Sequence, residues 1–476
     1  MQINFSLISH TNVGKTTLAR TLLRQEVGDV LDREHVTHQC ESYTMFEIQE
    51  DRLVLWDTPG FGFIQSQFVE ELHTTESPIE NFLTKTATAK TESTLWSSQL
   101  AVKNIRETAD IVLYLVDAKS DPEWLPYLPV EMKILGWINK PTVILLNQTG
   151  TPRASEDDTV EREKWYEPLK NYSFIKTILS LDAFTRCWVQ EGELFNTIGP
   201  LLPLEQQTTY DRLKSAWKEE NFQVFRSSIK ELARHLTESI YDSTTVSDES
   251  LFEKVGLVPG ERQKELKHAH REMSERLAQR VIETTNNLIH LHQLEGQSAK
   301  KTQSLTQNNL RVPEHVNESI WIAFGGAATG AATGLIADIL AGGLSFFGGA
   351  LLGAIGGGTG TYLLAKSYNL IQGNNNAVRW TRNHFLEQVQ LAMLSYLAVA
   401  HYGRGRGEWK DSESSQHWKN TIQQILSQYQ GQFEQLWEHG DDEYASKQQT
   451  ATKLNDLLKL CTTLTLQKLY PEVVIF

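Results

Sequence analysis

The start of the chain constrains the fold more than any other part of the sequence. The apolar run Ile3–Ile8 is typical of a buried strand, and a short loop after it ends in Gly14-Lys15-Thr16. An apolar-periodic segment, typical of a helix, begins directly after this loop. A strand, a Gly-Lys-Thr loop and a helix in this order predict a loop that binds phosphate groups.

Each residue type in this loop has a role in phosphate chemistry. Backbone N–H groups of a tight loop and of a helix N-terminus point at phosphate oxygens. Lys15 would add a positive charge at the β- and γ-phosphates, and the Thr16 hydroxyl would ligate Mg²⁺. The residues expected to hold the phosphates are Asn12, Val13, Gly14, Lys15, Thr16 and Thr17. One residue departs from the usual pattern, because Ser9 stands where a glycine normally begins the motif.

A second motif follows two further predicted strands, Ser42–Gln49 and Arg52–Asp57. The second of them ends in Asp57-Thr-Pro-Gly60, where the carboxylate would hold Mg²⁺ and the Gly60 N–H would contact the γ-phosphate. Thr37 precedes these strands and is the candidate for a further ligand of Mg²⁺ and the γ-phosphate. The catalytic set is therefore Lys15, Thr37 and Gly60, and the Mg²⁺ set is Thr16, Thr37 and Asp57.

The apolar runs of residues 110–117, 142–147 and 174–180 predict three more strands. Six strands that alternate with helices predict a doubly wound, mostly parallel α/β sheet. All the phosphate motifs then lie at the carboxyl ends of strands, where such sheets bind ligands. We assign this domain to residues 1–203, with residues 64–108 as an enlarged switch region and a helix.

A base-binding loop is expected after the fifth strand, at Asn147-Gln148-Thr-Gly150. Asn147 fits the pattern of a guanine site, whereas Gly150 stands where that pattern has a carboxylate for guanine N1 and N2. Ser180, after the last strand, is placed where backbone contacts to the base oxygen would come from. Asp182 has two interpretations, a displaced reader of the base or the N-cap of a helix.

Residues 204–476 have a different character, since strand patterns vanish and, outside the segment 320–366, Gly and Pro are rare. Long amphipathic segments predict a mainly α-helical domain. The predicted helices cover residues 205–242, 257–298, 377–402, 410–438 and 442–468.

Within this half, residues 320–366 carry one charge before Lys366, Asp338, and two ladders in which Gly recurs at every fourth residue. This spacing predicts a Gly-rich helical hairpin with closely packed arms. Each arm approaches the length that a bilayer needs, so the hairpin could touch or enter the inner membrane. Alternatively, it is a buried glycine-zipper hairpin in a water-soluble bundle. The weak hydrophobicity of the small Ala and Gly side chains favours this alternative, and Asp338 would be costly in lipid.

Composition narrows the function classes. The formal net charge of −14 argues against nucleic acid as the main partner. The three cysteines, at positions 40, 187 and 461, have no metal-ligand spacing and fit a reducing cytoplasm. The chain begins directly in the first strand, so we expect a cytoplasmic protein without a signal peptide. It would be either free or attached to the inner membrane, peripherally or through the inserted hairpin.

The N-terminal motifs together resemble the translation-factor-related class of P-loop GTPases, in particular the branch of ribosome-assembly and tRNA-modification GTPases. The whole chain resembles a bacterial family in which this domain precedes a helical domain of unknown function. The residues that carry the resemblance are His10-Thr-Asn-Val-Gly-Lys-Thr, Asp57-Thr-Pro-Gly, Asn147-Gln-Thr, Leu181-Asp-Ala-Phe-Thr-Arg-Cys-Trp and the Gly/Ala-rich segment.

The resemblance implies GTP and Mg²⁺ as cofactors and GTP hydrolysis as the activity. It also implies that Asn12 helps to hold a K⁺ ion, because Phe61 stands where many signalling GTPases have a catalytic Gln. We expect slow turnover in a molecular switch that couples nucleotide state to the helical domain and to an unknown protein partner. Two alternatives remain, a nucleotide-binding scaffold that barely hydrolyses, for which Ser9, Phe61 and Gly150 argue, and a protein that prefers ATP, for which Gly150 argues.

Overall fold

A computed structural model of the chain describes residues 1–24, 27, 39–62, 64, 66–85, 92–149, 155–184, 187–246, 259–293, 368–371, 377–402, 412–440, 446–471 and 473. The chain divides into two compact units. One comprises Met1–Phe222, His401–Gly407 and Leu469–Phe476, and the other comprises Gln223–Ala400 and Glu408–Lys468. The predicted boundary between residues 203 and 204 stays a prediction.

The first unit is built on a six-stranded sheet of order β2-β3-β1-β4-β5-β6. All neighbours pair in parallel except β2, which is antiparallel to β3. The strands are β1 (Gln2–Ser9), β2 (Glu41–Ile48), β3 (Asp51–Asp57), β4 (Ile111–Asp117), β5 (Thr142–Asn147) and β6 (Ile175–Ser180). The doubly wound, mostly parallel sheet predicted from the apolar runs is confirmed.

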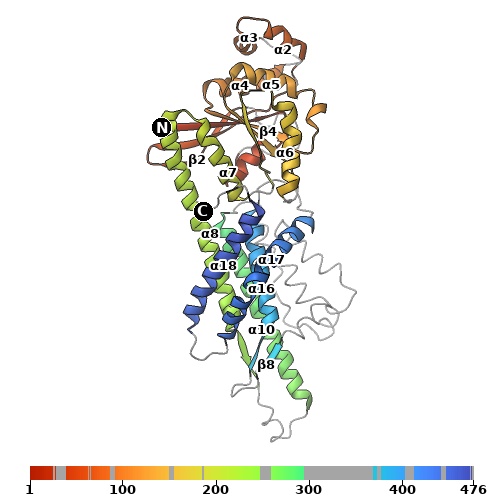
Figure 1. The fold of residues 1–476 in the computed structure, drawn as a ribbon, viewed down its shortest axis with the longest axis vertical. Coiled ribbons are helices and arrows are strands. Elements are labelled where there is room, and N and C mark those ends of the chain that lie inside the picture. The colour runs from red at the N-terminus through yellow and green to blue at the C-terminus, as the bar shows by residue number, and fades with distance from the viewer. Residues whose placement is uncertain are drawn as a thin grey trace. The chain divides into compact units, whose positions relative to one another are not determined.

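Helices cover both faces of this sheet, as Figure 1 shows for α4 and α5 on one side and α7 on the other. The helices are α1 (Lys15–Leu23), α2 (Ser66–His73), α3 (Pro78–Thr84), α4 (Glu92–Glu107), α5 (Leu128–Ile138), α6 (Ser155–Leu169) and α7 (Trp188–Ile198), with short 3₁₀ turns at Pro122–Trp124 and Gly199–Leu201. Burying both faces explains why β4 and β5 are continuous apolar runs.

The core between the sheet and helices α2 to α6 forms a single apolar cluster. Strand residues such as Tyr114 and Ile144 meet helix residues such as Ile105 and Ile134, all fully buried. Phe61, directly after the Asp57-Thr-Pro-Gly60 motif, belongs to the same cluster. The core thus extends to the edge of the sheet that carries the phosphate motifs.

The second half of the chain is mainly helical, as predicted. Its elements are α8 (Leu204–Ile240), which continues from the first unit, β7 (Ser243–Thr245), α10 (Pro259–Leu291), β8 (Tyr368–Ile371), β9 (Ala377–Trp380), α16 (Arg382–Ala400), α17 (Ser412–Glu438) and α18 (Lys447–Leu469). Among the described residues of this half, five long helices correspond closely to the five predicted segments.

The prediction that strands vanish from this half is wrong. Strands β7, β9 and β8 form a small antiparallel sheet, so the segment predicted as one helix over residues 377–402 begins as β9 and becomes helical only at Arg382. These strands are three or four residues long, which is too short for alternation to be read from sequence. The buried side chains of Val378 and Trp380 pack with Met273 and Leu277 of α10.

Asp242 connects the elements around this small sheet. Its carboxylate accepts hydrogen bonds from Arg276 (3.0 Å), Arg280 (2.7 Å) and the Trp380 indole (3.3 Å). The side chain is almost fully buried, so these partners are needed to offset the cost of removing the carboxylate from water.

The Gly-rich segment 320–366 lies outside the described residues. Among the helices that the structure does describe, none combines the length and the apolar character needed to cross a bilayer.

Candidate nucleotide site

The loop after β1 has a backbone that only certain residues can adopt. Gly14 has φ of 97° and Asn12 has φ of 63°, a left-handed region that Gly, and among the other residues Asn, adopts most readily. A Cβ atom on Gly14 would stand 2.8 Å from Asn147 Nδ2. Both the conformation and the close approach therefore require glycine, and α1 begins at the next residue.

Lys15 lies buried at the start of α1. Its Nζ donates a hydrogen bond to Ser9 Oγ at 3.0 Å. Burial lowers the pKa of Lys15 to about 8, against the opposing effects of the charges of Asp57 and Glu131. Ser9, the residue that replaces the usual glycine, is thus a direct partner of the lysine.

Thr16 and Asp57 meet beside the lysine. Thr16 Oγ1 donates to Asp57 Oδ2 at 2.7 Å, while Asp57 Oδ1 is buried without a hydrogen-bond partner among the described residues. Burial raises the pKa of Asp57 to about 6, although the hydrogen bond from Thr16 and the charge of Lys15 oppose this. A hydroxyl and a carboxylate with an unused oxygen are a donor set that suits Mg²⁺.

The segment after Asp57 is attached to the phosphate loop by backbone hydrogen bonds. Phe61 N donates to Ser9 O at 2.8 Å, and Thr11 N donates to Phe61 O at 3.1 Å. Gly60 consequently lies so near that a Cβ atom on it would be 2.8 Å from Lys15 Nζ and 3.0 Å from the Thr11 Cα atom. The structure therefore brings Lys15, Thr16, Asp57 and Gly60 to one place.

Asn147, predicted to contact the base, makes two hydrogen bonds within the protein. Its Nδ2 donates to Val13 O at 2.7 Å, and its Oδ1 accepts from Ala183 N at 2.8 Å. The side chain is fully buried, so it ties the phosphate loop to the loop after β6. Gln148 has φ of 57° and reaches the same carbonyl at 3.5 Å.

The loop after β6 brings two further candidates to this end of the sheet. Ser180 is buried, and its Oγ has no partner among the described residues. Asp182 Oδ1 accepts from Phe184 N at 2.7 Å and Oδ2 from Thr149 Oγ1 at 3.1 Å. The N-cap interpretation of Asp182 is wrong, because the carboxylate closes a local turn and the following helix is capped at Cys187.

The remaining candidates divide into two groups. Val13 and Thr17 are buried in the phosphate loop and in the first turn of α1, and Asn12 is exposed beside them. Thr37 and Gly150 lie outside the described residues.

Sequence reasoning missed a polar network behind the phosphate loop. His10 Nδ1 lies 2.7 Å from Glu131 Oε1, and Tyr114 donates to Glu131 Oε2 at 2.6 Å. The His10 ring also stacks on Tyr127, with centroids 3.9 Å apart. The available signal was a carboxylate within the predominantly apolar helix α5.

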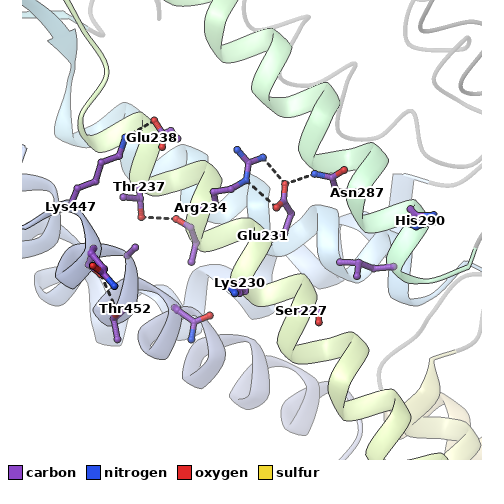
Figure 2. Close-up of a pocket in the computed structure, with 15 residues that line it drawn as sticks. Ser227, Lys230, Glu231, Arg234, Thr237, Glu238, Asn287, His290, Lys447 and Thr452 are labelled. Carbon is purple, nitrogen blue, oxygen red and sulfur yellow. Dashed lines mark hydrogen bonds and ion pairs between the residues drawn. The ribbon is translucent and has the colours of Figure 1, made fainter.

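The second unit has a separate groove between α8, α10 and α18, with a volume of about 960 Å³ (Figure 2). Glu231 of α8 accepts hydrogen bonds from Arg234 of the same helix and from Asn287 of α10. Lys447 of α18 forms an ion pair with Glu238 of α8 at 2.8 Å. Its charged lining residues are thus largely paired with one another.

Two family models match the chain. Residues 4–148 match a family described as a 50S ribosome-binding GTPase, and residues 171–458 match a domain of unknown function, DUF3482. None of the curated proteins compared with the chain matches it.

Solved structures of GTPases are similar to parts of the chain. An Era variant of Aquifex aeolicus bound to GDP and AlF₄⁻ is 20% identical over 42% of this chain and 57% of that one, with a TM-score of 0.29. Era in complex with MgGDPNP and a 16S ribosomal RNA segment is 16% identical over 58% and 89%, with a TM-score of 0.30. The bacterial selenocysteine-specific elongation factor is 18% identical over 42% and 29%, with a TM-score of 0.26.

The chain thus spans a little over half the length of the first of these structures, and the family models carry the assignment. One of them matches more than half of the chain, and the other covers the phosphate loop and the strands β1 to β5. The chain belongs to the DUF3482 family, and it joins an N-terminal P-loop GTPase domain to a mainly helical domain of unknown function.

Proposed function

We propose that this protein binds GTP with Mg²⁺ at the Lys15 site, hydrolyses it slowly, and acts as a molecular switch. The observation that carries the proposal is the meeting of Lys15, Thr16 and Asp57 at the carboxyl ends of β1 and β3. A buried lysine and a buried carboxylate are costly unless they are paired or bind charge. Nucleotide phosphates and Mg²⁺ would supply that charge.

Within this proposal, each residue has a separate role. Lys15 would hold the β- and γ-phosphates, and the backbone N–H groups from Asn12 to Thr17 would surround them. Thr16 and Asp57 would hold Mg²⁺, together with Thr37. The N–H of Gly60 would contact the γ-phosphate, which GTP carries and GDP lacks.

Hydrolysis needs a group that orients the attacking water, and Phe61 is unable to do so. Its side chain is apolar and fully buried in the core. We propose that Asn12, which is exposed within the loop, helps to hold a K⁺ ion, whose ligands would place the attacking water and whose charge would stabilise the transition state. Replacing Na⁺ with K⁺ should then accelerate phosphate release, whereas equal rates in the two salts would remove the K⁺ role.

A nucleotide-binding scaffold that barely turns over is the second candidate function. It is favoured by the hydrogen bond between Ser9 and Lys15 and by the burial of Phe61. Single-turnover phosphate release distinguishes the two functions, because a scaffold would bind GTP yet release no phosphate in either salt.

The choice of base depends on residues at the β5 and β6 loops. GTP is proposed from the family match, with Ser180 near the base, Asn147 holding the base-side loops and Gln148 beside it. Gly150 argues for ATP instead. Competition of unlabelled GTP and ATP for a fluorescent nucleotide on the full chain decides between them.

The helical half is proposed as the effector of the switch, with residues 320–366 as its contact to a membrane or to a protein partner. The competing hypothesis keeps this segment inside the helical domain. Flotation of the full chain with liposomes, against a chain that lacks residues 320–366, decides: equal flotation removes the membrane contact.

The direct test of the proposed site is the Lys15→Ala variant in calorimetry with GDP and Mg²⁺. We expect a loss of affinity of at least about a hundredfold, because the variant removes the charge-assisted contact to the phosphates. The control is Lys133→Ala, which removes a surface pair with Glu70 and should bind as the wild type does. Unchanged affinity in Lys15→Ala would contradict the proposed site.

A further inference from the structure

The side chain of His10, the second residue of the phosphate loop, is held by Glu131 and Tyr127. Its Nδ1 contacts the Glu131 carboxylate at 2.7 Å. Its ring lies parallel to that of Tyr127, with an interplanar angle of 6°. The Tyr114 hydroxyl fixes the other oxygen of Glu131. The ring therefore has one orientation, set by α5 and β4.

Glu131 is well suited to act as an anchor because it has little contact with water. Its side chain is 1% exposed, and that of His10 is 24% exposed. Burial raises the pKa of Glu131, whereas the hydrogen bond and charge of His10 oppose that rise most strongly, followed by Tyr114 and Lys15. A carboxylate at this depth is stable only with such partners, so His10 and Glu131 hold each other in place.

The backbone of His10 is equally constrained, by the segment that follows Asp57. The hydrogen bonds from Phe61 N to Ser9 O and from Thr11 N to Phe61 O enclose His10 on both sides, and His10 and Phe61 form a parallel bridge. Gly60 is the residue before Phe61, and it lies against Lys15 and Thr11. The position of His10 thus sets the position of Gly60 relative to the lysine.

We propose that His10 and Glu131 are positioning residues for GTP hydrolysis, which fix the Gly60 N–H at the γ-phosphate through the backbone pair of His10 and Phe61. The inference rests on the proposed function, because it requires GTP at the Lys15 site. Neither side chain needs to touch the nucleotide. The pair would affect only the contact to the γ-phosphate. Its loss should therefore weaken the binding of GTP and leave the binding of GDP nearly unchanged.

The experiment compares Glu131→Leu with Glu131→Gln in the full chain. Leu removes both hydrogen bonds of the carboxylate, whereas the Gln amide can still bond to His10 and Tyr114. For Glu131→Leu we expect kcat and the preference for GTPγS over GDP to fall about tenfold each. This corresponds to the loss of one hydrogen bond, from the Gly60 N–H to the γ-phosphate. Affinity for GDP should stay within about threefold of the wild type, and Glu131→Gln should recover most of both losses.

Two further variants keep the test interpretable. Tyr127→Leu removes the stacking on His10, while Glu131 keeps its hydrogen-bond partners. This variant should therefore fold even if Glu131→Leu does not. Its kcat and its preference for GTPγS over GDP should fall, but less than in Glu131→Leu. His73→Gln changes a histidine that stacks on Trp137 at the surface of the same domain and should leave both quantities unchanged. Thermal melting of each variant with GDP establishes that it is folded.

The outcomes separate this inference from the function on which it rests. If the wild type binds no GTP, both are wrong. If the wild type hydrolyses GTP and folded Glu131→Leu does so equally well, only the positioning role is wrong. If Glu131→Leu loses affinity for GDP as much as for GTPγS, Glu131 acts through the charge of Lys15, and positioning through Gly60 is again wrong.

Discussion

At the scale of single residues, the site depends on positions where one residue type is required. Gly14 combines a positive φ with the contact to Asn147. Lys15 and Asp57 are both buried, with pKa values displaced toward their neutral forms. Such displaced pKa values are typical of functional sites. The backbone of Gly14 and the pKa of Asp57 each lead to a prediction at this scale.

Gly14→Ala should impair the phosphate loop directly. Ala at positive φ costs about 1 kcal/mol or more, and its Cβ atom would displace the Asn147 amide that holds Val13. We expect nucleotide affinity to fall at least about tenfold, measured by calorimetry with GDP. Gly431→Ala is the matched control: nothing lies within 4 Å of the added Cβ atom in α17, so it should raise stability by about 0.5–1 kcal/mol. Equal affinities for the two variants would contradict the role of Gly14.

Asp57 should make the stability of the nucleotide-free protein depend on pH. Its pKa is about 6 in the folded chain and 3.8 when the carboxyl group is free in water, so folding favours the protonated acid. Stability from this group is present below pH 4 and is lost as the pH rises toward 6 and above. The loss amounts to about 3 kcal/mol.

Asp57→Asn should therefore melt at a higher temperature than the nucleotide-free wild type at pH 7.5, and the difference should shrink as the pH falls toward about 4. The same variant should lose the stabilisation that Mg²⁺ with GDP gives the wild type. Thermal melting across this pH range measures both effects. If the variant is less stable than the wild type at pH 7.5, burial of the ionised Asp57 carboxylate does not destabilise the fold.

At the scale of elements, the sequence predicted the long helices and strands, whose apolar residues recur at a regular spacing. It did not predict the short strands or the contacts between distant parts of the chain. The six strands of the sheet and the five long helices follow from apolar periodicity. The strands around Val378 and Trp380 did not, because their three or four residues carry too short a pattern. The links of His10 to Glu131 and of Asn147 to Val13 were also missed, since residues more than a hundred positions apart meet only in the folded chain.

A buried polar cluster connects three helices of the second unit. His235 of α8, Thr284 of α10 and Gln388 of α16 line a cavity of about 30 Å³, and each has a side-chain atom without a partner among the described residues. Burial lowers the pKa of His235 to about 4, and the charges of Arg280 and Arg234 add to this effect. The fold therefore requires the neutral imidazole.

Protonation of His235 should destabilise the helical half in acid. Its pKa falls from 6.5 to about 4 on folding, so stability from the neutral ring is complete above pH 6.5 and is lost as the pH falls toward 4. The loss amounts to about 3 kcal/mol. His235→Gln should show a smaller fall in melting temperature over this range than the wild type does.

His268→Gln, on an exposed part of α10, is the control and should follow the wild type. If His235→Gln and His268→Gln lose stability in parallel on acidification, the buried ring is not the group responsible.

At the scale of the whole molecule, the two family matches divide the chain between a GTPase domain and a domain of unknown function. The DUF3482 match begins at residue 171, before the end of the sheet, and α8 continues from the first compact unit into the second. A switch would be expected to use such a continuous helix to transmit nucleotide state. The pattern of the sequence identified the two halves but assigned no activity to the helical one.

Nucleotide state should accordingly change the helical half. Hydrogen exchange of the full chain in GDP and in GTPγS should differ in α10 as well as in α2 to α4, because a switch must have two states with different affinities for the nucleotides. Differences confined to residues 1–203 would indicate a GTPase domain that is not coupled to the rest. Lys15→Ala, which should not bind either nucleotide, is the control for exchange in the unbound state.

GTP hydrolysis at the buried Lys15 site is the proposed activity of this protein. Single-turnover phosphate release by the full chain, with Mg²⁺ and K⁺, tests it most directly when the wild type is compared with Lys15→Ala and with Lys133→Ala. We expect Mg²⁺-dependent release from the wild type and from Lys133→Ala, and none above background from Lys15→Ala. Equal release by all three, or no release by the wild type, would contradict the claim.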